Sequence, residues 1–192
     1  MSSSRVREAP AAPRSGFVAA RSEQPADLYL DGTLVDSSGD LLAALNHVLA
    51  ADGLPAASLG ELRRMVGDGA PVLVERAYRR HGLSPPADAL ERFRERYGRR
   101  CLERTRPYGG VPELLEGLAP EREVAVVTNK PTAFARQILA GLDLAALAPT
   151  VVGPELARRR KPAPEHLLAA LAEMGFGGDL GGLSGRAGSR DR

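Results

Sequence analysis

The sequence is poor in cysteine, lysine and long apolar runs, and each shortage narrows what the protein can be. A single cysteine among 192 residues excludes a disulfide within the chain. Cys101 falls on an apolar helical stripe, which predicts a buried thiol rather than a nucleophile. Lysine occurs only twice, at Lys130 and Lys161, so arginine carries most of the positive charge. No apolar run approaches the roughly eighteen residues that a membrane helix needs.

The overall charge and composition are ordinary for a globular protein. Hydrophobic residues make up 43% of the chain, charged residues 26%, and the formal net charge is +2. No basic patch is interleaved with aromatic residues, so we expect no nucleic-acid partner. Residues 1-26 lack an apolar targeting segment and predict a disordered tail, and residues 177-192 predict an irregular tail. We expect a cytoplasmic protein with no membrane partner.

The order of patterns along the chain is strand, helices, then alternating strands and helices. Apolar runs predict strands at 27–30, 123–128 and 150–152, and amphipathic patterns fill 39–105 and 164–174. Within the first of these helical stretches, the residues from Ser58 to Glu61 form a capping box that predicts the start of a helix. Such an order predicts an α/β fold, a Rossmann-like parallel sheet of about three recognisable strands with a helical insert after the first.

Polar residues stand at the end of each predicted strand. Asp31 follows the first strand, Thr128 and Asn129 follow the second, and Lys161 follows the third. Ligands of open parallel sheets bind at the carboxyl ends of the strands. A hydroxyl group, backbone N–H groups and an ammonium group brought together there would bind phosphate.

These motifs resemble those of the haloacid dehalogenase superfamily of aspartyl-phosphate phosphatases, and most closely its phosphoglycolate phosphatase branch. The resemblance covers about residues 27 to 175. It is carried by the segments LDGTLVDS (30–37), VGDGA (66–70), TRPYGGVPELLEGL (105–118), VVTNK (126–130) and RKPAP (160–164).

The resemblance implies a fold, a reaction and a set of roles. Residues 27-38 and 106-176 would form the phosphatase core, and residues 39-105 a helical cap. The implied reaction is magnesium-dependent hydrolysis of 2-phosphoglycolate, a small phosphorylated metabolite, to glycolate and phosphate through an aspartyl-phosphate.

Individual residues take roles by the same resemblance. Asp31 would be the acid/base residue and would offer its main-chain carbonyl to magnesium. Thr128, Asn129 and Lys161 would bind the phosphate. The segment Gly67, Asp68 and Gly69 is either a substrate-selecting loop of the cap or a helix-breaking turn.

The chain departs from the family pattern at two places. Tyr29 occupies the nucleophile position, where the family has an aspartate; a phenol is mostly protonated at neutral pH and is a poor magnesium ligand. No fourth acidic motif follows Gly175, and two of the three sources of metal ligands are therefore missing. We expect weak magnesium binding and impaired hydrolysis.

Other functions fit the same residues. The chain could be a catalytically dead, truncated or frameshifted remnant of such an enzyme, or a non-catalytic phosphate-binding module that keeps Thr128 and Lys161. Among enzymes, a phosphomutase or dehalogenase relative is the alternative, although the segments TNK and TRPY favour the phosphatase.

Overall fold

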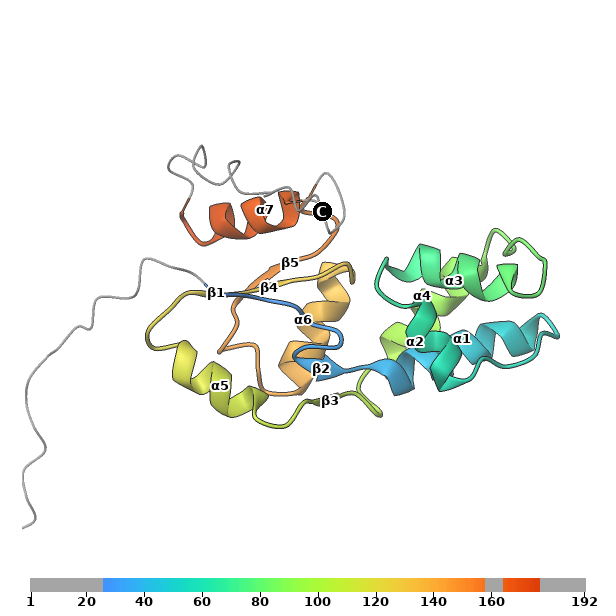
Figure 1. Cartoon of the computed structure of the whole chain (residues 1–192), viewed down its shortest axis with the longest axis horizontal. Helices are drawn as coiled ribbons and strands as arrows, with labels where there is room; N and C mark the ends of the chain where they lie inside the picture. The colour runs from blue at the N-terminus through green and yellow to red at the C-terminus, as the bar shows by residue number, and fades with distance from the viewer. Residues whose placement is uncertain (1–25, 158–163, 177–192) are drawn as a thin grey trace, which may run out of the picture.

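The structure is a computed structural model that describes residues 26–157 and 164–176. The predicted tails, apart from Ala26, and the phosphate-binding candidate Lys161 lie outside these described residues. The described part consists of a unit built on a parallel sheet and a unit built only of helices, which lie side by side (Figure 1).

Three parallel strands form the sheet that the sequence predicts. They are β1 (Ala26–Leu28), β4 (Val124–Val127) and β5 (Thr150–Val152), in the order β1-β4-β5. The prediction of a parallel α/β sheet is confirmed.

The first strand is shorter than predicted. The predicted strand 27–30 includes Tyr29, whereas in the structure Tyr29 lies after the strand. The strand ends at Leu28, because the carbonyl of Leu30 turns away to accept the N–H groups of Leu34 at 2.9 Å and Val35 at 3.0 Å. Tyr29 and Asp31 therefore follow the strand in a turn, and strand alternation does not place them on one face.

Helices cover both faces of the sheet, which explains why every residue of β4 is buried. Val124 and Val126 belong to the main core, which includes residues of α5 (Val111–Leu118) and α6 (Thr132–Gly141). The alternate residues of β4, Ala125 and Val127, form a smaller core with α7 (Glu165–Glu173). Figure 1 shows α7 on one side of the strands and α6 on the other.

The second unit, called the helical unit here, contains the helices between residues 38 and 100. They are α1 (Ser38–Ala51), α2 (Leu59–Met65), α3 (Ala70–Arg79) and α4 (Ala89–Arg100). The capping box predicted at the start of α2 is present, because the Ser58 hydroxyl accepts the Glu61 N–H while the Glu61 carboxylate accepts the Ser58 N–H. No helix of the described residues has both the length and the apolar character to cross a membrane.

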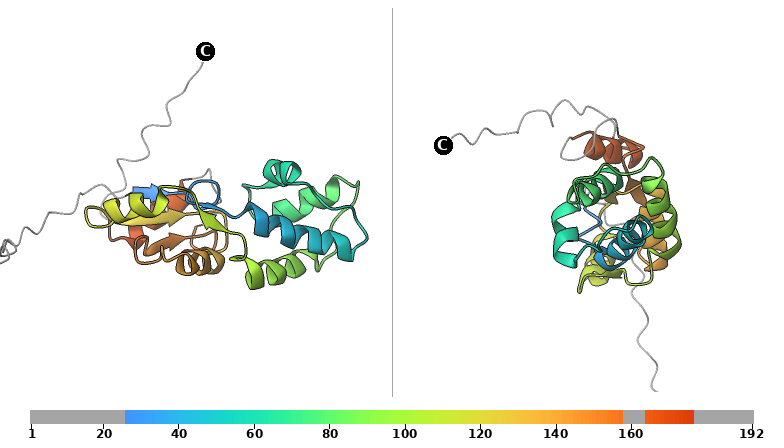
Figure 2. Two further views of the ribbon diagram at one scale, coloured as in Figure 1. Left: turned by 90° about the horizontal axis from the view of Figure 1, so that it is seen from below. Right: turned by 90° about the vertical axis from the view of Figure 1, so that its right-hand side faces the viewer.

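Two short connecting segments join the units, and they pair with each other. These segments are β2 (Val35–Asp36) and β3 (Arg106–Pro107), which form an antiparallel pair that the sequence pattern did not predict. In Figure 2 (left) they are the blue and yellow-green segments that run between the units.

A buried carboxylate holds the two connections together. Asp40, on the first turn of α1, is 3% exposed and accepts hydrogen bonds from the backbone N–H groups of Arg104 and Thr105 and from the Thr105 hydroxyl, at 2.8–3.0 Å. All of these partners are donors, so the site requires an acceptor-only side chain. Asp40 thereby fixes where α1 starts relative to the chain returning from α4.

Replacing this carboxylate with an amide should destabilise the protein. Asp40→Asn places an NH2 group among donors, and we expect the free energy of unfolding to fall by about 2–4 kcal/mol. The exposed and isosteric control Glu116→Gln should change it by less than about 0.5 kcal/mol. Urea denaturation of the three proteins measures both effects, and equal stabilities would contradict this role of Asp40.

Candidate phosphate site between the two units

A tight turn after β1 positions Asp31. Gly32 adopts a positive φ of 78°, which a side chain would strain, and its N–H donates to the Val35 carbonyl at 3.0 Å. Asp31 Oδ1 accepts the Ser37 hydroxyl at 2.5 Å and pairs with Lys130 Nζ at 2.9 Å. The carboxylate is thus held from its own turn and from the end of β4.

The end of β4 presents Thr128 beside Asp31. Its N–H donates to the Val152 carbonyl at 3.0 Å, which continues the pairing of β4 with β5. Its Oγ1 accepts the Lys130 N–H at 3.0 Å, and this leaves the hydroxyl proton to be donated to a ligand. Asn129 Nδ2 donates to the Gly67 carbonyl at 2.8 Å and so connects this loop to the helical unit.

Lys130 is the most deeply buried charged side chain of the site. Its Nζ contacts Asp31 in the sheet unit and donates to the Tyr97 hydroxyl of α4 at 2.5 Å. Burial alone would lower the pKa of Lys130, but the charge of Asp31 and the contact with Tyr97 outweigh it, so that the pKa is raised. The ammonium group therefore stays charged and links the two units.

The ammonium group lies 4.6 Å from the ring centroid of Tyr97, which belongs to a cluster of three aromatic rings. Tyr97 stacks on Phe93 with ring centroids 5.9 Å apart and meets Phe134 of α6 edge to face at 5.6 Å. Burial raises the pKa of Tyr97 to about 12, against the opposing effect of Lys130. Tyr97 is consequently a neutral hydrogen-bond acceptor for Lys130 at ordinary pH.

Two cavities lie between the units and adjoin at Asp31. The first, called the aromatic cavity, has a volume of about 130 Å³. Its polar end contains Asp31, Thr128, Asn129 and Lys130, and its rings are Tyr29, Phe93, Tyr97 and Phe134. The second, called the polar cavity, has a volume of about 360 Å³ and contains Asp31, Asp36, Ser37, Ser38, Arg63 and Tyr108.

Several residues predicted from the sequence meet in the aromatic cavity. Tyr29, Asp31, Thr128 and Asn129 line it, although they come from two different strand ends. Tyr29 is 57% exposed, and its alignment with the nucleophile of the family stays a prediction. Lys161 lies outside the described residues, so its expected place in this cavity stays a prediction.

The predicted glycine loop lies over the site only in part. Gly67 and Gly69 line the aromatic cavity, whereas the carboxylate of Asp68 pairs with Arg76 of α3 at 2.6 Å. The loop separates α2 from α3, as expected of a helix-breaking turn, and its Gly67 carbonyl also accepts a hydrogen bond from Asn129 of the sheet unit. It is therefore a helix-breaking turn that borders the cavity; substrate selection by it stays a prediction.

Sequence reasoning missed the side chains that connect the units. Lys130 is one of only two lysines and falls within the VVTNK segment, but neither signal predicts its contact with Tyr97 of the helical unit. Tyr97 lies on the same apolar helical stripe as Cys101, and no local pattern predicts that its hydroxyl meets Lys130. Arg63, which lines the polar cavity, is one of many arginines and gave no signal.

The donors at this site do not make up a magnesium site. Magnesium takes oxygen ligands, mainly carboxylates, in an octahedral arrangement. Tyr29 presents a phenol there, and the carboxylate Oδ1 of Asp31 is already engaged by Ser37 and Lys130. Binding of magnesium by the main-chain carbonyl of Asp31 stays a prediction. Within residues 26–157 and 164–176, no three or more His, Cys, Asp or Glu side chains are grouped so that they could hold a metal ion.

With this geometry established, similarity to known proteins identifies the family. The model of the haloacid dehalogenase-like hydrolases matches residues 29–178, which is most of the chain. The chain therefore belongs to the haloacid dehalogenase-like hydrolase family.

Individual relatives agree with this assignment. The N-acetylmuramic acid 6-phosphate phosphatase of Pseudomonas aeruginosa is 37% identical over 149 residues, which are 77% of this chain and 66% of the relative. The phosphoglycolate phosphatase of Caulobacter vibrioides is 37% identical over 153 residues, 76% of this chain and 64% of the relative. The chain thus spans about two thirds of the length of these relatives.

A solved structure shows the same fold. The crystal structure of a predicted phosphoglycolate phosphatase from Haemophilus somnus matches with a TM-score of 0.70 and 31% identity. The match covers 79% of this chain and 71% of that one. The expected resemblance to the phosphoglycolate phosphatase branch is confirmed by these neighbours.

The raised pKa of Tyr97 predicts a loss of stability in alkali. Tyrosine in an unfolded chain has a pKa of about 10, below the value of about 12 for Tyr97 in the folded protein. Stability that depends on the neutral phenol is therefore fully present below pH 10 and is lost as the pH rises toward 12. The variant Tyr97→Phe should lack this part of the loss.

Urea denaturation at about pH 9 and about pH 11 gives the fall in the free energy of unfolding between these two pH values. We expect this fall to be about 1 kcal/mol larger in the unaltered chain than in Tyr97→Phe. Burial also raises the pKa of Tyr78 to about 12, and this residue contributes equally to both proteins. Parallel losses in the two proteins would contradict a buried, neutral Tyr97.

Proposed function

We propose that the chain binds phosphate monoesters in the manner of a phosphoglycolate phosphatase, with the helical unit as the cap over the site. The observation that carries this proposal is the meeting of Asp31, Thr128 and Asn129 in one cavity at the strand ends. Open parallel sheets bind ligands at this edge. The names of the relatives, both phosphatases of small phosphorylated compounds, support the same class of ligand.

The polar end of the aromatic cavity supplies donors for a phosphate group. The Thr128 hydroxyl accepts the Lys130 N–H and so retains its own proton for a phosphate oxygen. Lys130 places a buried positive charge next to Asp31. We propose that Lys161 adds a further ammonium group to the phosphate, as the family motif implies.

Asp31 is our proposed acid/base residue, and its surroundings suit a fixed position. Ser37 and Lys130 hold its Oδ1, while the cavity gives a leaving-group oxygen access to the carboxyl group. A proton held at this carboxyl would pass to the alkoxide that departs from phosphorus. Displacement of this alkoxide requires a nucleophile on the opposite side of the phosphorus. By the family resemblance, Tyr29 is the residue at that position.

Tyr29 and the incomplete set of metal donors favour binding over turnover. A neutral phenol does not attack a phosphate dianion readily, and without a metal ion the charge that develops on the transferring group is poorly compensated. We therefore propose that hydrolysis of 2-phosphoglycolate by this chain is negligible. A non-catalytic phosphate-binding module is the second candidate, and the phenol at the nucleophile position is the observation in its favour.

Two repairs should restore hydrolysis only when they are combined. Tyr29→Asp supplies a nucleophile, and the C-terminal part of the Caulobacter vibrioides relative, placed after Phe176, supplies the acidic motif that the family resemblance implies. Each repair leaves the other deficiency in place. We expect the doubly repaired protein to release phosphate from 2-phosphoglycolate at least about a hundredfold faster than either single repair, and only with magnesium.

The matched control carries the same C-terminal part together with Tyr108→Asp. Tyr108 is another exposed tyrosine near Asp31, and it lines only the polar cavity. This control should release no more phosphate than the unaltered chain. Efficient release by the unaltered chain or by Tyr29→Asp alone would show that the nucleophile or the metal site lies elsewhere.

A further inference from the structure

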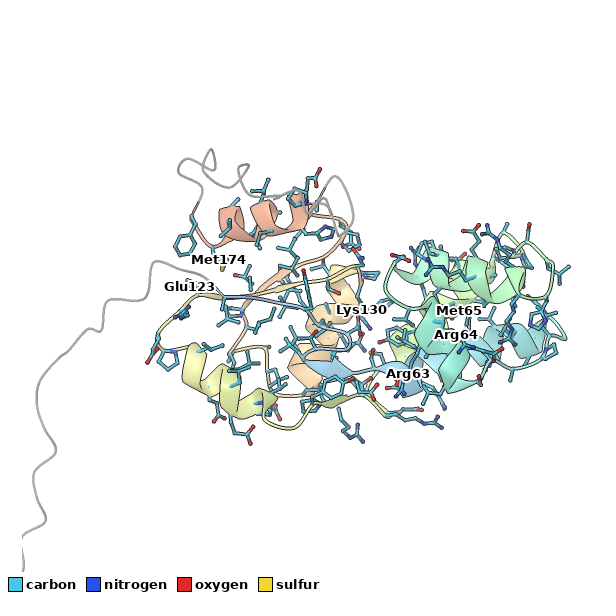
Figure 3. All side chains as sticks on the ribbon, viewed as in Figure 1. Arg63, Arg64, Met65, Glu123, Lys130 and Met174 are labelled. Atoms are coloured by element: carbon cyan, nitrogen blue, oxygen red, sulfur yellow. The ribbon has the colours of Figure 1, made fainter. Side chains whose placement is uncertain are left out.

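The polar cavity contains one cationic side chain that the proposed phosphate site does not use. Arg63 lies on α2 of the helical unit and lines this cavity, with Asp31, Ser37 and Ser38 on the facing wall. Figure 3 shows Arg63 where the two units meet. Among the residues that the structure describes, no hydrogen bond or ion pair engages its guanidinium group, which is exposed.

The carboxylates near Arg63 are already satisfied by other groups. Asp36 Oδ1 accepts both the N–H and the hydroxyl of Ser38, at 2.9 Å and 2.5 Å. These bonds, with a smaller contribution from the charge of Arg63, lower the pKa of Asp36. Asp31 pairs with Lys130. Arg63 is therefore a cation of the polar cavity whose charge reaches Asp36, while its guanidinium N–H groups make no hydrogen bond to the described residues.

The aromatic cavity offers no comparable group on the side of the helical unit. Its wall there consists of side chains without charge, such as Leu41, Val66, Leu73 and Phe93. A second anionic group on a ligand would find no partner among them, and burying it there would be costly. It would find one in the polar cavity, which adjoins at Asp31.

We propose that Arg63 binds the carboxylate of a phosphate ester whose phosphate lies at Thr128. The inference rests on the proposed function and adds to it the residue of the helical unit that would recognise the carboxylate. The substrates in the names of the two relatives, phosphoglycolate and N-acetylmuramic acid 6-phosphate, both combine a phosphate with a carboxylate. The planar guanidinium group matches a carboxylate with two parallel hydrogen bonds, which lysine does not reproduce.

Calorimetric titration with two ligands tests this role without requiring turnover. The ligands are 2-phosphoglycolate and ethyl phosphate, which has a methyl group in place of the carboxylate. We expect the full chain to bind 2-phosphoglycolate about tenfold more tightly than ethyl phosphate, as a charge-assisted pair provides. The variant Arg63→Gln should bind both ligands with the affinity that the unaltered chain has for ethyl phosphate, and Arg63→Lys should recover only part of the preference.

The adjacent Arg64 provides a matched control. It is also exposed and lies on the same helix, but it lines neither cavity, so Arg64→Gln should keep the tenfold preference. Equal losses in Arg63→Gln and Arg64→Gln would indicate a general charge effect and overturn the inference. Equal affinity of the unaltered chain for both ligands would overturn the inference alone. Binding of neither ligand would contradict the proposed phosphate site and the inference with it.

Discussion

The contact of Lys130 with Asp31 and Tyr97 is the interaction on which the site depends. An ammonium group is expensive to bury, and it is retained here because a carboxylate and a phenol replace its water. Asp31 comes from the turn after β1 and Tyr97 from α4, so one side chain holds together two strand ends and a helix of the other unit. The hydrogen bond from Asn129 to the Gly67 carbonyl joins the same two units.

This arrangement separates the groups that bind from the groups that react. The donors at the end of β4 and the turn that carries Asp31 line one cavity together with residues of the helical unit. The residue that the family resemblance aligns with the nucleophile is the exposed Tyr29. On our proposal, the chain keeps the donors at the end of β4 that would bind an anion and lacks the group that would attack phosphorus.

The features that the sequence predicted are those that depend on local patterns. The continuous apolar run of β4, the capping box at Ser58 and the polar residues at strand ends are readable because period and turn chemistry act over a few residues. The two-residue strands β2 and β3 have no period to detect. The first strand ends early because the Leu30 carbonyl accepts the N–H groups of Leu34 and Val35 in a local turn, whereas the apolar pattern there continues to Leu30. The partners of Lys130 and of Asp40 are distant in sequence, and only the docking of the units brings them together.

A double-mutant cycle between Asp31 and Lys130 tests the central claim most directly. The cycle compares the free energies of unfolding of the unaltered chain, Asp31→Asn, Lys130→Met and the double variant. If the buried pair joins the site to the helical unit, each single change leaves an unmatched polar group and the two effects are not additive. The account predicts a coupling free energy of about 2 kcal/mol or more. A coupling below about 0.5 kcal/mol, the range of independent sites, would contradict it.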